Sequence, residues 1–171
     1  MKTKILILLL IVTIATGACK KEKLTKETQI GANTFSCKIN GKVYKVKPDF
    51  LSETLTGGIY LRSTQKYELS LEGVMFNGEK SDYTISLGIP EFASAGFFDL
   101  RDNNICYIYT NVNGNQYTSK ISKEGYINIK YIDYSNRICA GTFEFVGVNI
   151  NNPNDKIYVT EGRFDVKNKR N

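Results

Sequence analysis

The stretch FSCKINGKVYKV, residues 35–46, decides the fold class of this chain. Apolar and polar side chains alternate on both sides of its central Asn-Gly pair, and alternation with period two is typical of a half-buried β-strand. Asn-Gly is the strongest short signal for a two-residue hairpin loop, because both central residues of a type I′ turn need positive φ. Such a loop sets Cys37 opposite Tyr44 and Phe35 opposite Val46 on one shared face. We therefore predict an antiparallel hairpin here.

The same alternation recurs along the rest of the chain, and turn residues separate one run from the next. A helical turn is expected only at residues 93–96. Short strands at intervals of roughly 8–12 residues indicate an antiparallel sandwich or barrel. We predict an all-β fold, a single antiparallel β-sandwich or small barrel. Its further strands are expected at residues 67–71, 83–87, 105–110, 126–132, 136–148, 157–160 and 163–166.

The first 18 residues have the pattern of a bacterial export signal. Lys2 and Lys4 precede an apolar run, and small residues follow it up to Cys19. The apolar run is about half of the ~20 residues that a transmembrane helix needs. Residues 16–19, Thr-Gly-Ala-Cys, resemble the lipobox of bacterial lipoproteins, in which the cysteine is lipidated and becomes the new N-terminus. We expect cleavage before Cys19 and attachment to the membrane through lipid on it, and an ordinary secreted protein is the alternative.

The predicted domain organisation follows from this leader. Residues 1–18 form the signal peptide, and residues 19–30 form the lipidated cysteine with a polar, lysine-rich flexible tether. Residues 31–168 form the β domain, and residues 169–171 form a frayed tail. The stretch from Lys20 to Ile30 could hold the domain up to roughly 35 Å from the lipid surface. Lys20 stands where an aspartate favours inner-membrane retention in some lineages, so we expect the outer membrane, with either face possible.

The net charge of +6 does not indicate a nucleic-acid-binding protein. Two lysines leave with the leader, and from Thr28 onward 17 basic residues stand against 15 acidic ones. Basic and acidic residues are interspersed, whereas binding to a phosphate backbone needs a clustered basic face. We expect no nucleic-acid partner.

Three cysteines remain in the domain: Cys37, Cys106 and Cys139. In an oxidising envelope two of them could form a disulfide, in any of three pairings, and burial of each in the core is an equally good interpretation. The sequence has no Cys-x-x-Cys pair, the usual signature of redox exchange or zinc binding.

The remaining residues give little indication of catalysis. The chain has no histidine, which removes Ser-His-Asp and Cys-His arrangements and the commonest metal ligand. Paired carboxylates remain conceivable, with Glu144 and either Glu161 or Asp165 as candidates. Residues 102–104 and an Asn-rich loop expected at residues 149–155 offer oxygen atoms to a cation, but neither has the spacing of a calcium loop. We expect no enzyme, no catalytic residue, no cofactor and no metal ligand.

Two segments carry a resemblance to a known family. TQIGANTFSC at residues 28–37, followed by INGKV at 39–43, resembles the start of a family of uncharacterised Bacteroidota lipoproteins. GTFEF at residues 141–145 and EGRFDV at 161–166 are similar to the C-terminal hairpin of that family. The resemblance implies an envelope location and a β-rich domain, and it brings no catalytic residues.

A non-enzymatic binding or structural domain is the expected function. Tyrosines such as Tyr60, Tyr117 and Tyr134 could contact an envelope protein or stack on sugars, or they could simply fill the faces of the sheet. The alternative is a small β-barrel that carries a small apolar ligand, which would need a cavity.

Overall fold

The computed structural model describes residues 22–47, 54–110 and 113–168, so Cys19, the leader and the predicted tail lie outside the described residues. Nearly all regular structure in the described part is antiparallel β-strand, with one short helical turn, α2 (Ser119–Ser122). The predicted all-β class is confirmed. The strands are β1 (Thr34–Ile39), β2 (Lys42–Lys45), β3 (Leu55–Ser63), β4 (Lys66–Asn77), β5 (Lys80–Phe92), β6 (Gly96–Asp99), β7 (Ile105–Thr110), β8 (Gln116–Thr118), β9 (Gly125–Asp133), β10 (Ile138–Asn149) and β11 (Asn152–Lys167).

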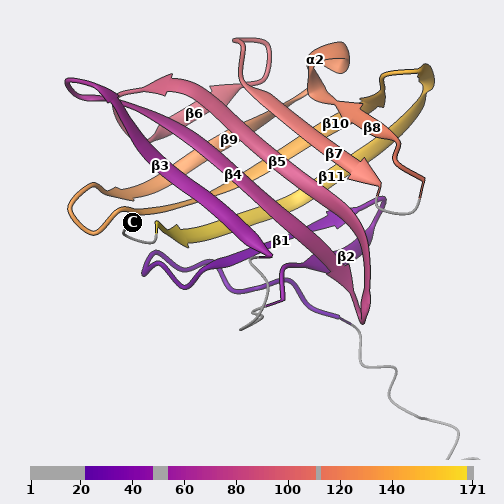
Figure 1. Ribbon diagram of the computed structural model, residues 1–171, viewed down its shortest axis with the longest axis horizontal. Helices are drawn as coiled ribbons and strands as arrows, with labels where there is room; N and C mark the ends of the chain where they lie inside the picture. The colour runs from indigo at the N-terminus through magenta and orange to yellow at the C-terminus, as the bar shows by residue number, and fades with distance from the viewer. Residues whose placement is uncertain (1–21, 48–53, 111–112, 169–171) are drawn as a thin grey trace, which may run out of the picture.

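The strands form one large sheet that returns on itself. The pairing runs β11-β1-β2-β4-β5-β7-β8-β10, and β10 pairs again with β11, which completes a circuit. β3 lies beside β4, while β9 and then β6 extend from β10. Figure 1 shows two layers, with β3, β4, β5 and β7 crossing steeply over β9, β10 and β11. The architecture therefore combines a closed ring of strands with the facing layers of a sandwich.

The predicted hairpin is β1–β2, and its register is confirmed. Cys37 lies opposite Tyr44, and the amide of Val46 donates to the carbonyl of Phe35 at 2.9 Å. The two loop residues have φ values of 47° at Asn40 and 80° at Gly41, as a type I′ turn needs.

Some elements differ from the sequence prediction. The helical turn expected at residues 93–96 is wrong, because Gly96 opens strand β6 and the turn lies at α2. The hydroxyl of Thr118 caps that turn by accepting from the amide of Lys120 at 3.2 Å. The two strands expected at 157–160 and 163–166 are one strand, β11, with a register shift around Glu161. The turn between β10 and β11 is correspondingly shorter than the predicted Asn-rich loop.

Aromatic and aliphatic side chains fill the space between the two layers. The rings of Phe35 and Phe143 stack with centroids 5.1 Å apart, and Phe145 and Phe164 flank Phe143. Each fully buried side chain of this size contributes about 1.5–3 kcal/mol. The largest fully buried side chains are Phe35, Phe143, Ile39, Leu69, Leu71, Met75, Ile85, Leu87, Ile89, Ile108, Ile127 and Ile129.

The side of β3 that faces away from β4 is held by an amide from the end of β11. Asn168 accepts from the amide of Ile59 at 3.0 Å and donates to the Ile59 carbonyl at 2.6 Å. This two-bond contact imitates a neighbouring strand and joins β3 to the opposite layer. Gly58 makes the approach possible, because a Cβ there would lie 1.5 Å from the Asn168 Oδ1 atom.

In the part of the chain that the structure describes, none of the helices has the length and apolar character needed to cross a bilayer.

Candidate functional site

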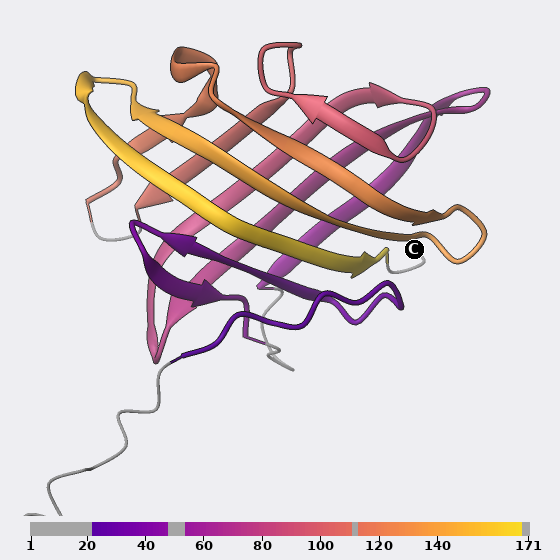
Figure 2. The same ribbon diagram turned by 180° about the vertical axis from the view of Figure 1, so that it is seen from behind.

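Residues 22–32, here named the N-terminal strap, lie across the outer face of the sheet. Ser36 and Asp165 point to this face because their neighbours Phe35 and Phe164 belong to the core. Figure 2 shows the strap in indigo along the lower border, below β1 and β11. The sequence predicts a solvated tether up to Ile30, and the structure corrects this over residues 22–30, which are bound to the domain.

Asp165 is the centre of the strap contact. Its side chain is 0% exposed, although it lies on the outer face, because the strap covers it. One carboxylate oxygen accepts from the amide of Gly31 at 2.8 Å. The other accepts from the Thr28 hydroxyl at 2.6 Å and from the amides of Ile30 and Ala32 at 3.1 and 3.2 Å. A buried carboxylate is tolerated only where donors satisfy it, and here the strap supplies four of them.

Polar contacts extend along the preceding half of the strap. The hydroxyls of Thr25 and Ser36 lie 2.7 Å apart, and the Thr25 amide donates to Ser36 Oγ at 3.1 Å. Arg163 Nη1 donates to the Thr25 carbonyl at 3.0 Å. Together with an ion pair of 3.2 Å between Glu22 and Lys45, these contacts fix the strap over β2, β1 and β11 in turn.

A second ion pair fixes the strap over β9. Lys130 Nζ lies 2.9 Å from the Glu27 carboxylate. The hydrogen bond from Lys130 lowers the pKa of Glu27, and the nearby charges of Lys130 and Arg163 act in the same direction. Glu27 is therefore ionised at neutral pH, and the pair is fully charged.

A surface hollow of about 390 Å³ lies where the strap passes over β9, β10 and β11. Its walls are mainly polar, and the Glu27–Lys130 pair and two small residues of β10 are among the residues that line it. Hydroxyl, amide and charged groups converge there, so the hollow could admit water or a small polar molecule. It is lined by Glu27, Thr28, Gln29, Lys130, Ala140, Gly141 and Phe164.

The three cysteines are free thiols buried in the core. They lie on separate strands: Cys37 on β1, Cys106 on β7 and Cys139 on β10. Burial raises the pKa of all three, to about 12 for Cys139, where Asp165 adds a smaller contribution in the same direction. The thiols are packed and protonated, as the core interpretation of these residues expects.

The tyrosines singled out in the sequence occupy different surroundings. Tyr60 and Tyr134 are exposed, at 46% and 40% of their surface, and Tyr134 stacks on Tyr67 with ring centroids 4.1 Å apart. Tyr117, by contrast, is buried, and its hydroxyl donates to Asp155 at 2.8 Å. The expectation that Tyr117 offers a contact surface is therefore wrong, because this side chain supports the turn between β10 and β11.

The candidate carboxylates make structural contacts. Glu144 accepts from the backbone amide of Glu161, whose own carboxylate forms an ion pair with Lys38. The structure therefore brings Glu144 and Glu161 together, whereas Asp165 belongs to the strap contact.

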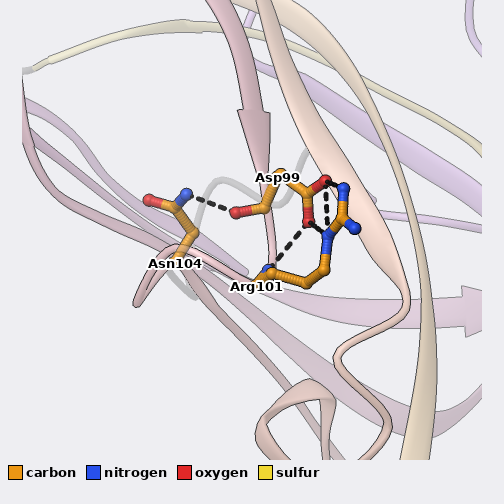
Figure 3. A network of polar contacts seen from close by, with 3 residues as sticks. All are labelled: Asp99, Arg101 and Asn104. Carbon is orange, nitrogen blue, oxygen red and sulfur yellow. Dashed lines mark hydrogen bonds and ion pairs between the residues drawn. The ribbon is translucent and has the colours of Figure 1, made fainter.

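The acidic and Asn-rich turn after β6 is also an internal network (Figure 3). Both carboxylate oxygens of Asp99 accept from the Arg101 Nε at 3.0 Å, and Asn104 donates to the Asp99 carbonyl at 2.7 Å. The hydrogen bonds from Arg101 lower the pKa of Asp99. The amide of Asn104 thus closes the turn as a donor.

Neither protein-family models nor curated proteins nor solved structures match the chain. The geometry by itself defines the class: a single antiparallel β domain whose N-terminal strap is bound to the outer face by a buried carboxylate. Sequence reasoning missed this contact. Its only signal is an acid in the run Phe164-Asp165-Val166, and such an acid ordinarily faces solvent.

Proposed function

We propose that this protein is a lipoprotein of the bacterial outer membrane, anchored through lipid on Cys19, whose β domain has a non-enzymatic binding or structural role in the envelope. The leader and the Thr-Gly-Ala-Cys stretch at residues 16–19 support the anchor. The observation that carries the proposal is the strap. The segment that follows the proposed lipidation site is bound to the domain from Glu22 onward, as expected of a part that transmits a fixed attachment.

The state of the reactive groups supports a non-enzymatic role. The three thiols have raised pKa values and are buried, so they are poor nucleophiles at neutral pH. The carboxylates of Asp165, Asp155 and Asp99 are each satisfied by hydrogen bonds within the domain. Carboxylates whose hydrogen bonds are already made within the domain stabilise its structure and are less available to bind a substrate.

The carrier alternative would require the interior to open. The stacked Phe35 and Phe143 rings lie in the core, together with a set of fully buried aliphatic side chains. A small apolar ligand would have to displace some of them. Native mass spectrometry of protein purified gently from its own envelope tests this directly, because a retained small-molecule mass would favour the carrier over the structural role.

Metabolic labelling tests the anchor. Cells that express the full chain are grown with radiolabelled palmitate, and their envelopes are fractionated. The wild-type protein should carry label and appear in the outer-membrane fraction. The Cys19→Ser variant should lose both the label and its place in the outer-membrane fraction. The control variant Lys20→Ala, at the next residue, should retain the label because it leaves the acylated thiol in place.

Two outcomes would overturn the proposal. Unlabelled wild-type protein in the soluble periplasmic fraction would exclude the lipid anchor. Label that persists in Cys19→Ser would place the lipid on another residue.

A further inference from the structure

The net positive charge of the mature chain is confined to one region. Residues 20–47, which contain the strap and the β1–β2 hairpin, hold eight lysines and two glutamates. From residue 48 to the end, 13 basic residues stand against 15 acidic ones, so the rest of the chain is slightly negative. The strap contacts β1 and β2 directly, and in Figures 1 and 2 these segments lie together along the lower side of the domain.

Several of these lysines are available to a partner. Lys23, Lys26 and Lys42 are exposed. Lys45 and Lys38 are partly neutralised by Glu22 and Glu161, and Glu27 is paired with Lys130 from β9. The exposed charge that remains on the strap and hairpin is therefore basic.

The strap also carries an exposed apolar side chain. Ile30 is 73% exposed, the largest fraction among the exposed large hydrophobic residues in the described part of the chain. Its amide is held by Asp165, which fixes the backbone at this point while the side chain projects outward. Lysines together with an exposed aliphatic side chain are typical of a surface that lies on anionic lipid.

The bound strap keeps this surface close to the proposed anchor. Cys19 precedes Glu22 by three residues. A chain spans at most about 3.6 Å per residue, so their Cα atoms lie no more than about 11 Å apart. The free spacer predicted from the sequence would reach about three times as far. Glu22 contacts Lys45 on β2, so the strap and hairpin are the part of the domain nearest the lipid.

We infer that the face formed by the strap and the β1–β2 hairpin lies against the anionic phospholipid headgroups of the leaflet that holds the anchor. The inference rests on the proposed lipidation of Cys19 and adds an orientation to it. The exposed lysines supply attraction to the headgroups, Ile30 enters the interfacial region, and the turn between β10 and β11 points away from the bilayer.

Energy transfer to labelled lipid tests this orientation. The lipidated full-length mature protein carries a donor dye on one introduced cysteine, from Gln29→Cys on the strap or Asn151→Cys in the β10–β11 turn. The buried native thiols, with their raised pKa values, leave the introduced thiol as the reactive one. The vesicles contain phosphatidylcholine, about one-third phosphatidylglycerol and a lipid with an acceptor dye on its headgroup. Energy transfer from position 29 should exceed transfer from position 151 about twofold or more. High salt should reduce this difference because it screens the charges.

A charge-reversal pair provides the matched control. Lys23→Glu, Lys26→Glu and Lys42→Glu together should abolish the difference between the two positions. Lys120→Glu, Lys123→Glu and Lys156→Glu make the same change of net charge on exposed residues near α2 and the β10–β11 turn and should leave the difference intact. Thermal unfolding followed by circular dichroism checks that both triple variants fold.

The outcomes separate the two proposals. Wild-type protein that fails to stay on vesicles of phosphatidylcholine alone would overturn the lipid anchor itself. Anchored protein with equal transfer from both positions on anionic vesicles would overturn the orientation and leave the anchor standing. A preference that persists unchanged in the strap triple variant would overturn the attraction between these lysines and the headgroups as the cause of the orientation.

Discussion

At the scale of single residues, Asp165 decides whether the N-terminal strap is part of the domain. Four donors from the strap converge on its carboxylate, and each of them would face an amide group in the Asp165→Asn variant. The new NH₂ group would then oppose at least one of these donors, which would lose its acceptor. Because a hydrogen bond to a charged group contributes about 1.5–3 kcal/mol, we expect the free energy of unfolding to fall by about 2 kcal/mol. Hydrogen exchange at the amides of Ile30, Gly31 and Ala32 should accelerate.

The matched control for this prediction is Asp102→Asn, the same chemical change at an exposed position. It should alter the free energy of unfolding by less than about 0.5 kcal/mol. Urea unfolding gives the stabilities, and exchange followed by mass spectrometry reports on the strap. Unchanged exchange at residues 30–32 in Asp165→Asn would contradict the role assigned to this carboxylate.

At the scale of elements, the contact between Asn168 and Ile59 holds strand β3 to the opposite layer. Asn168→Ala leaves the amide and carbonyl of Ile59 without partners in a buried place. We expect a loss of about 1–3 kcal/mol, the usual cost of an unsatisfied buried group. Gly58→Ala should cost a similar amount because its Cβ would displace the Asn168 side chain.

Asn154→Ala, an exposed asparagine in β11, controls for the loss of an amide side chain. The Gly58→Ala and Asn168→Ala changes act on one contact, so their combined effect on the free energy of unfolding should be smaller than the sum of the two. Strict additivity in urea unfolding would mean that Gly58 and Asn168 act independently.

Some of these elements could be predicted from the sequence, and others could not. The β1–β2 hairpin could be predicted with its register because its loop chemistry and its alternation are local. Strand β3 could not, because it contains Gly57 and Gly58 and presents mainly exposed residues, so it lacks a continuous apolar face. Its place depends on the register with β4 and on Asn168, which lies 109 residues away from Ile59.

The strap is the clearest case of a feature that the local sequence pattern does not predict. Residues 22–32 have no periodicity, and that pattern normally predicts a solvated spacer. They are ordered by partners on β1, β2, β9 and β11, whose side chains share one face only after the whole sheet has formed. Asp165 could therefore be singled out as an acid, but its burial under the strap could not be predicted.

At the scale of the whole molecule, the closed circuit of strands places the first and last strands side by side. β1 pairs with β11, so the strap that precedes β1 covers residues of the last strand. The proposed anchor at one end of the chain thus attaches to the fold through both its first and last strands. Pulling on the proposed lipid would load the sheet across several strands, as the proposed anchored role requires.

The ionisable groups predict how the stability of the whole domain depends on pH. Hydrogen bonds from Asn149 and Tyr117 lower the pKa of Asp155, and Lys130 lowers that of Glu27. The unfolded chain therefore binds protons more readily than the folded one, and stability falls as the pH drops below about 4. Burial raises the pKa of Tyr44 and of Cys139, each to about 12. The folded state therefore retains protons that the unfolded chain loses, and stability also falls as the pH rises above about 9. Urea unfolding from acid to alkaline pH should show a plateau between these limits, and Asp155→Asn should flatten the acid side. A stability that increases below pH 4 would contradict the assignment of these carboxylates.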